Sequence, residues 1–368
     1  MNLQTFGFIG LGLIGGSIAK AIRKFYPTAT IIAYDNCIES LQLAKSENIL
    51  DTYIASFELE SYHFANCDVI FLCTPVEFNH SYLNKLIGIV PDTCLFTDVG
   101  SVKNPIHQTV NALQITKRFI GGHPMAGSER SGYSASTATL LENAYYILTP
   151  ESEVSSDIIR DFSNFISSLS ALPITMDSKY HDYVTAAISH LPHMLAYSLV
   201  HTIQMLDDEN HTIRAIAAGG FKDITRIAGS SPVMWQQICS ENKTSLLELM
   251  DKYIASINEL KDMIEAEESN ALYDYFYNAK EYRNSFDNVI NGPISRAHYI
   301  TVSIIDKAGA IADISTLFAN NNISMKNIGI VHNREFEEGV LRIVFYDDGA
   351  KKAALSLLKG TEYIVYEK

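Results

Sequence analysis

The sequence is short of positive charge. Its 28 lysine and arginine residues stand against 42 aspartate and glutamate residues, which gives a formal net charge of −14 with histidine neutral. A surface for nucleic acid or for an anionic membrane needs basic stripes, so both classes of partner are excluded. A small anionic ligand is not excluded, because a few local Arg or Lys side chains and a helix N-terminus can bind one inside an acidic protein.

Cysteine and long apolar runs are also scarce. The five cysteines are scattered without any C-x-x-C spacing, which excludes a disulfide scaffold or a zinc site and predicts reduced, buried thiols. No uninterrupted apolar run approaches the roughly 18–20 residues of a membrane-spanning helix. No basic segment precedes the first apolar stretch, as a secretory signal would require. These absences predict a soluble cytoplasmic protein without a resident metal.

What is present is ordinary globular composition, with 47% hydrophobic and 19% charged residues in a chain of 368, enough for two or three domains. Residues 1–176 alternate short apolar runs with helical patterns, which is typical of a Rossmann-type α/β domain with a doubly wound parallel sheet. The predicted strands cover residues 6–9, 30–34, 69–73, 94–97, 118–120, 144–148 and, after a helix at 156–169, 172–176.

From residue 177 to 291 helical periodicity replaces the β-branched runs, which predicts an all-α domain. Its helices are expected at 180–206, 212–227, 231–239, 243–266 and 271–286. Several of them are too apolar for a lone surface layer, so we expect this domain to pack against a second copy of the chain.

The cluster Asn291-Gly292-Pro293 predicts a linker to a third domain at 296–368. Its elements follow the order strand, helix, strand, strand, helix, strand, which is the ferredoxin-like order βαββαβ. They are expected at 298–305, 310–320, 324–332, 340–345, 350–358 and 362–366.

Glycines after the first strand predict a dinucleotide site. Gly10, Gly12 and Gly15 form G-x-G-x-x-G between that strand and an apolar helix. There the first glycine makes a tight turn, the second lets the backbone approach a pyrophosphate and the third allows close helix–strand packing. Asp35 ends the next strand, where a carboxylate accepts hydrogen bonds from both ribose hydroxyls and repels a 2′-phosphate. The pattern therefore favours NAD over NADP.

Histidines on two segments are candidates for chemistry. His123 is predicted on a glycine-flanked loop, where a neutral imidazole can reach a nicotinamide and accept a hydroxyl proton. A turn histidine bonded to backbone is the alternative. His190 and His193 flank Pro192, which is expected to kink their helix. A metal site is disfavoured there, because neither H-E-x-x-H nor an accompanying carboxylate is present.

Two cations follow in the helical region. Lys222 and Arg226 are four residues apart and are predicted to share a helix face. They suit a dicarboxylate, with Arg226 able to bind one carboxylate through two parallel hydrogen bonds. A solvated face, partly neutralised by Asp223, is the open alternative. Trp235, the only tryptophan, is predicted to lie in the core.

Taken together, segments 10–17, 98–103, 121–132, 189–193 and 219–235 resemble the prephenate/arogenate dehydrogenase family, the TyrA enzymes of tyrosine biosynthesis. The C-terminal domain, with Asp306 and Gly309 between its first strand and helix, resembles an ACT domain, a module that binds amino acids. The resemblance implies NAD-dependent oxidative decarboxylation of prephenate to 4-hydroxyphenylpyruvate and CO2, with feedback regulation by L-tyrosine. It leaves open whether arogenate is the substrate.

The resemblance also implies roles for individual residues. His123 would take the proton of the C4 hydroxyl, and Ser101 would orient His123 and lie between substrate and nicotinamide. Four residues would bind the substrate: His193, Arg226, Lys222 and Ser128. Among them, Arg226 would hold the ring carboxylate. The cofactor would contact Gly10, Gly12, Leu13, Ile14, Gly15, Asp35, Thr74 and Ser101. L-Tyrosine would bind near Asp306 and Gly309, and the helical domain would form a homodimer.

Two other interpretations remain open from the residues alone. One is an oxidoreductase of similar build that acts on a β-hydroxy acid or an imine. It shares the glycine loop but does not predict segments 121–127 and 189–193 together. The other is a regulator that senses NAD and an amino acid without turnover.

Overall fold

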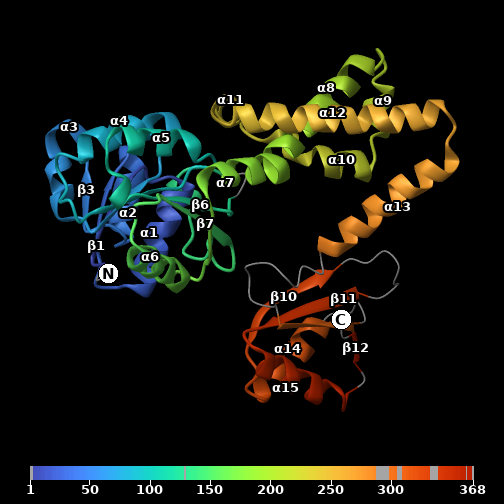
Figure 1. The fold of residues 1–368 in the computed structure, drawn as a ribbon. Coiled ribbons are helices and arrows are strands. Elements are labelled where there is room, and N and C mark those ends of the chain that lie inside the picture. Colours follow the sequence, from blue (N-terminus) through green and yellow to red (C-terminus); the bar gives the residue numbers. More distant parts are fainter. Residues whose placement is uncertain are drawn as a thin grey trace. The chain divides into compact units, whose positions relative to one another are not determined.

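The computed structural model describes residues 3–127, 130–286, 298–304, 309–331, 339–361 and 363–366 (Figure 1). By their internal contacts the residues group into two compact units, 1–267 and 268–368. The division at 176 and 291 that the sequence suggests stays a prediction, since residues 177–267 group with the first sheet. The predicted linker at 291–293 lies outside the described residues.

Five parallel strands form the first sheet and confirm the predicted doubly wound fold. In spatial order β3-β2-β1-β4-β5, they are Thr52–Ile54, Thr30–Tyr34, Thr5–Ile9, Val69–Leu72 and Leu95–Asp98. The order reverses between β1 and β4, which is where sheets of this kind bind ligands. Strand β3 is missing from the sequence prediction, because three residues carry too little pattern to be recognised.

Each face of this sheet has its own core, as the two-residue period of a strand requires. Phe6 and Phe8 of β1 pack with α1 (Leu13–Phe25), α2 (Ile38–Ser46) and α6 (Ser156–Ser168). Ile9 lies on the other face, in the core that includes α3 (Phe57–Glu60), α4 (Val76–Leu86) and α5 (Asn104–Ala112). Figure 1 shows helices on both sides of the strands. Both faces of the sheet are therefore covered, and its edges remain available for a ligand.

The next three strands correct the prediction of one parallel sheet. Strands β6 (Ile120–Pro124), β7 (Tyr145–Pro150) and β8 (Leu172–Thr175) form a separate sheet, in which β6 and β7 are antiparallel. An isolated bridge between Phe96 and Phe119, and not a continuous ladder, connects the backbone of this sheet to that of the first. The described chain between β6 and β7 contains a single short 3-10 turn and no crossover helix, so a parallel pairing is not reachable.

The helical part of the first unit begins with α7 (Ser178–Thr185), a π-helical turn at Ala186–His190 and α8 (Leu191–Leu206). The irregular turn immediately precedes Pro192, where the sequence predicts a kink. The predicted helix at 212–227 is wrong. Two short helices replace it, α9 (Thr212–Ile216) and α10 (Gly219–Thr225), because Ala217 and Ala218 are extended and two glycines follow.

Helices α11 (Pro232–Glu241) and α12 (Lys243–Glu265) complete this part. Large apolar side chains of α8 to α12 remain exposed in the single chain: Leu199, Met205, Leu206, Ile216, Ile224, Val233, Met234, Leu247, Ile254, Ile257 and Ile264. Such an extended apolar surface is typical of a protein–protein interface.

The second unit contains α13 (Ser269–Ser285) and an antiparallel sheet ordered β10-β11-β9-β12. Its strands are β9 (His298–Ile304), β10 (Met325–Val331), β11 (Gly339–Phe345) and β12 (Ile364–Tyr366), with helices α14 (Ala310–Asn320) and α15 (Asp348–Leu358). One core joins strands and helices through Val302, Ile314 and Phe345. The predicted ferredoxin-like order is confirmed.

Two sequence expectations concern the surface. Cys67 and Cys94 are buried as predicted, whereas the prediction of a buried thiol is wrong for Cys37, which is exposed at the start of α2. Within the described ranges, no helix has both the length and the apolarity needed to cross a membrane.

Candidate active site

The glycine loop has the geometry of a pyrophosphate site. Gly10 has φ +93°, and a Cβ there would lie 2.8 Å from the Cys73 backbone, so only glycine fits. A Cβ at Gly15 would collide with the Gly10 carbonyl oxygen. Gly12 instead faces open space and precedes α1 without a side-chain cap. The unpaired amides of the first turn, at Leu13 and Ile14, are therefore suited to an anion.

Asp35 lies beside this loop at the end of β2. Its carboxylate accepts hydrogen bonds from the Leu11 amide at 2.5 Å and from the Cys37 amide at 2.7 Å. Two backbone donors fix its orientation and leave lone pairs for the hydroxyls of a ribose. The glycine loop and Asp35 together fit a dinucleotide. Thr74, at the end of β4, donates its hydroxyl to Asn79 at 2.6 Å.

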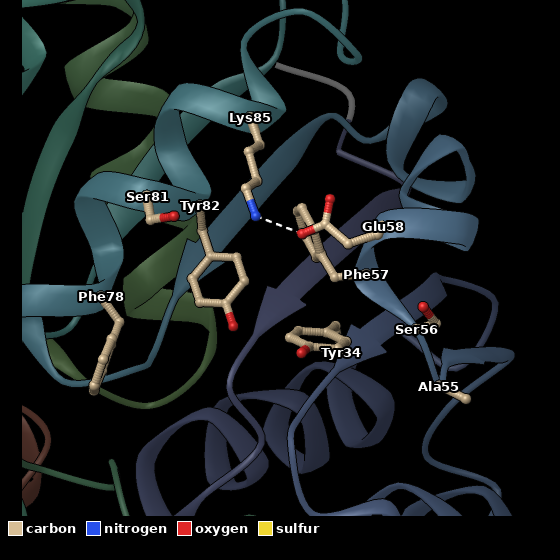
Figure 2. Close-up of a pocket in the computed structure, with 9 residues that line it drawn as sticks. All are labelled: Tyr34, Ala55, Ser56, Phe57, Glu58, Phe78, Ser81, Tyr82 and Lys85. Carbon is tan, nitrogen blue, oxygen red and sulfur yellow. Dashed lines mark hydrogen bonds and ion pairs between the residues drawn. The ribbon is translucent and has the colours of Figure 1, made fainter.

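A cavity of about 310 Å³ lies at the same edge of the sheet (Figure 2). Rings of Tyr34, Phe57 and Tyr82 line it, with centroids 5.0–5.7 Å apart. Lys85 and Glu58 form an ion pair at its rim, at 2.5 Å. Flat aromatic walls beside Asp35 suit a planar base.

His123 lies on strand β6, opposite Ile147 of β7, and not on the predicted loop. The flanking glycines serve close packing instead. A side chain at Gly121 would clash with Thr149 and His107, and one at Gly122 would clash with the Asp98 carbonyl and Tyr146. The strand fixes the imidazole more firmly than a loop would.

The ring of His123 is partly buried and faces the helical part of the unit. Its Nδ1 is 2.8 Å from Nε2 of His181 on α7. Burial is the main cause that lowers the pKa of His123 well below its usual value, and the positive charges of neighbouring groups lower it further. The imidazole is therefore neutral at physiological pH, as a proton acceptor must be.

A buried ion pair between Lys103 and Asp98 packs against the strand that carries His123. Nζ of Lys103 contacts the Asp98 carboxylate and donates to the Gly122 carbonyl at 2.6 Å. Both side chains are fully buried. The pair connects β5 to β6 directly beside His123. The charged residues of segment 98–103 therefore have a structural role here. Removing one partner would leave an uncompensated buried charge.

Three buried nitrogens without a hydrogen-bond partner lie on the helical side: His190 Nε2, His193 Nδ1 and Trp235 Nε1. His193 stacks on Trp235 with ring centroids 3.9 Å apart, and His190 meets it edge-on at 5.9 Å. Trp235 is buried as predicted, and its indole N–H also has no hydrogen-bond partner among the described residues. The sequence offered no signal for this second property beyond its being the only tryptophan.

Arg226 lies near His193. Its guanidinium is one cause that lowers the pKa of His193, after burial, while a hydrogen bond with the Ile227 backbone acts in the opposite direction. Arg226 begins a 3-10 turn after α10, so it does not share one regular helix with Lys222 as predicted. Both side chains are exposed in the single chain.

Three predicted residues remain outside this cluster. Ser128 and Asp306 lie outside the described residues. Ser101 follows β5 and is partly buried, and its role in orienting His123 stays a prediction; Nδ1 of His123 is in contact with Nε2 of His181. His181 and its neighbour Asp182 are absent from the sequence prediction. No group of three or more His, Cys, Asp or Glu side chains in the described part of the chain is arranged to hold a metal.

Glu241 of α11 provides a test of the packing between the two parts of this unit. Burial, and then repulsion from Glu77 of α4, raise its pKa to about 7. Because its folded pKa lies above its unfolded value, its ionisation destabilises the fold increasingly from about pH 4.5 up to pH 7, and fully above. Glu241→Gln should therefore raise the free energy of unfolding by about 1 kcal/mol at pH 8, allowing for partial exposure, and by only about a quarter of that at pH 5.

Urea unfolding followed by the fluorescence of Trp235, which lies on the same helix, measures this difference. Glu265→Gln is the control, because Glu265 is an exposed partner of Lys261 on α12. An equal gain for Glu241→Gln at both pH values would contradict the explanation.

A glycine loop at the edge of a parallel sheet, a neutral histidine on β6 and buried ring nitrogens without partners on the helical side together define a nicotinamide-dependent oxidoreductase. Comparisons with known proteins agree. The family description "Prephenate dehydrogenase, nucleotide-binding domain" matches residues 18–174, and "Prephenate dehydrogenase, dimerization domain" matches residues 177–278. The chain belongs to the prephenate dehydrogenase family, NAD-dependent oxidoreductases of tyrosine biosynthesis.

Individual relatives support the assignment. The chain is 36% identical over 357 residues to prephenate dehydrogenase of Bacillus subtilis (strain 168), covering 95% of this chain and 94% of that protein. A crystal structure of prephenate dehydrogenase from A. aeolicus, in complex with hydroxyphenyl propionate and NAD+, is 33% identical, with a TM-score of 0.73 over 78% of this chain and 99% of that one. Synechocystis arogenate dehydrogenase is 26% identical, with a TM-score of 0.69 over 77% and 100% of the two chains.

Proposed function

We propose that this chain catalyses the NAD-dependent oxidative decarboxylation of prephenate to 4-hydroxyphenylpyruvate and CO2, with His123 as the proton acceptor. The observation that carries the proposal is the contact between His123 on β6 and His181 on α7, which brings a partly buried imidazole to the meeting point of the strands and the helical part. Aromatisation of the ring supplies the driving force of this reaction. The protein therefore has to position C4 of the substrate against the nicotinamide and to stabilise the developing carbonyl.

The cofactor would be held by the residues at the ligand-binding edge of the first sheet. The amides of Gly12, Leu13 and Ile14 would bind the pyrophosphate beside Gly10 and Gly15, and Asp35 would accept from the ribose hydroxyls. The aromatic cavity at Tyr34 suits the adenine, and Thr74 and Ser101 would flank the nicotinamide. Bound NAD+ supplies the acceptor for the hydride that leaves C4.

The protein's own groups would handle the proton and the charges. His123 would take the C4 hydroxyl proton as the carbonyl forms, and would return it to the phenolate oxygen after CO2 leaves C1. Arg226 would hold the ring carboxylate, with His193 beside it and Lys222 at the entrance. Ser128 would complete the substrate contacts, and Ser101 would lie between the substrate and the nicotinamide.

Two further proposals concern assembly and regulation. The exposed apolar side chains of α8 to α12 would be covered by a second copy in a homodimer, as the matched dimerisation domain indicates. In the ferredoxin-like sheet unit, Gly309 precedes α14 with φ +92°, so the helix N-terminus is approachable. L-Tyrosine would bind there, near Asp306, and inhibit the enzyme.

Parallel initial-rate kinetics on the full chain test these proposals. NADH formation is measured with prephenate and with arogenate, each with and without L-tyrosine. We expect a higher kcat/KM with prephenate and a loss of rate on adding L-tyrosine. A preference for arogenate would overturn the assignment of prephenate as the substrate. No turnover of either compound would contradict the proposed reaction. Unchanged rates, with no heat of L-tyrosine binding in calorimetry, would remove the regulatory proposal.

A further inference from the structure

A second histidine lies directly behind the proposed proton acceptor. His181 of α7 is fully buried, and its ring centroid is 5.1 Å from that of His123. Its Nε2 is 2.8 Å from His123 Nδ1, and its own Nδ1 is 2.8 Å from Oδ1 of Asp182. The three side chains therefore form one hydrogen-bonded line from the helical part to the reaction centre.

The direction of these hydrogen bonds follows from Asp182. Its two carboxylate oxygens accept the backbone amides of Lys103 at 2.7 Å and Asn104 at 2.8 Å, so the group acts as an acceptor only. His181 must then donate from Nδ1, and a neutral His181 keeps a lone pair on Nε2. That lone pair can accept only if His123 carries its proton on Nδ1. The remaining nitrogen of His123, Nε2, is left unprotonated.

The surroundings keep both rings neutral. Burial lowers the pKa of each ring; Lys103 lowers both further, and Asp182 partly opposes the effect at His181. The other groups facing the pair are the buried Asp98, His190 and Thr185, whose hydroxyl is 3.4 Å from His181 Nε2. None of these competes for Nδ1 of His123.

We infer that His181 and Asp182 are positioning residues that hold His123 in the Nδ1–H tautomer, so that its Nε2 faces the substrate hydroxyl as a proton acceptor. This inference rests on the proposed role of His123. It also explains why the Asp182 carboxylate contacts His123 through the His181 ring and not directly. A carboxylate in direct contact with His123 would lie closer to the dianionic substrate and repel it. The neutral ring of His181 instead orients His123 while the charge of Asp182 stays farther from the substrate.

Two variants of His181 separate this role from simple packing. Gln places an amide oxygen near the position of Nε2 and can still accept from His123, whereas Met fills the space without an acceptor. His181→Met should lower kcat by ~10–100-fold, with KM for prephenate and NAD+ changed less than ~3-fold. His181→Gln should restore kcat to within ~5-fold of the wild type.

A double-mutant cycle provides the second measurement. Because His181 acts through His123, His181→Met should cost almost nothing further in the His123→Asn background. An equal loss in both backgrounds, or a kcat within 3-fold of wild type for His181→Met alone, would overturn the inference. Full activity of His123→Asn would instead overturn the proposed role of His123 itself, so the two failures are distinguishable.

A measurement on the wild-type enzyme covers the case in which the variants fold poorly. Long-range ¹H–¹⁵N correlation spectra of ¹⁵N-histidine-labelled protein report the tautomer of each ring, with the His123 signals assigned by their absence from His123→Asn. The inference predicts a protonated Nδ1 and an unprotonated Nε2 for His123. A protonated Nε2 in the neutral ring would overturn it.

Discussion

Replacing His123 with asparagine is expected to lower kcat by at least ~10²-fold, while KM for prephenate changes only modestly. Asparagine keeps a polar group of similar size at this position of β6 but cannot accept the hydroxyl proton. The loss therefore falls on the chemical step and not on binding. Initial rates of NADH formation at saturating NAD+, over a range of prephenate concentrations, separate kcat from KM.

His63→Asn is a matched control on the same domain. His63 is exposed, and among the described aromatic side chains its ring contacts only that of the neighbouring Tyr62, so its replacement should leave both constants unchanged. A His123→Asn enzyme with wild-type kcat would show that another group accepts the proton, or that no general base is needed.

Replacing Arg226 with alanine is expected to raise KM for prephenate by ~10–100-fold, since a charged hydrogen bond contributes about 1.5–3 kcal/mol. KM for NAD+ should stay within ~2-fold, because the cofactor binds on the first sheet. Arg226→Lys should recover only part of the loss, since an ammonium keeps the charge but not the two parallel hydrogen bonds.

Arg160→Ala serves as the control for this change. Arg160 is an exposed residue of α6 that pairs with Asp157 in the preceding turn. It should leave KM for prephenate unaltered. If Arg226→Ala had the same KM as the wild type, Arg226 would not belong to the substrate site.

Local sequence patterns predicted most of the architecture. Strands β1, β2 and β4 are apolar runs bounded by breakers, and the elements of the ferredoxin-like unit follow one another with clear changes of period. The glycine loop and Asp35 were predictable for the same reason, because a turn, a helix start and a strand end are all local features. In the structure Gly10 has a positive φ and Asp35 accepts from the Leu11 amide, while the contacts of both with a cofactor stay a prediction.

Features that depend on distant contacts were not predictable. The antiparallel direction of β7 depends on its pairing with β6, and that pairing also makes the segment around His123 a strand. The contact between His123 and His181 joins residues 58 positions apart. Neither His181 nor Asp182 belongs to a motif, and a His-Asp pair in a helix is ordinarily a surface feature. Only the fold shows that α7 carries this pair to β6.

A crystal structure of the His123→Asn enzyme with NAD+ and prephenate tests the central claim most directly, because the slow variant allows the unreacted substrate to be seen. The account predicts the C4 hydroxyl within hydrogen-bond distance of the Asn side chain and the ring carboxylate on the guanidinium of Arg226. Prephenate bound with its C4 hydroxyl turned away from β6, or with Arg226 lining a different cavity, would contradict it.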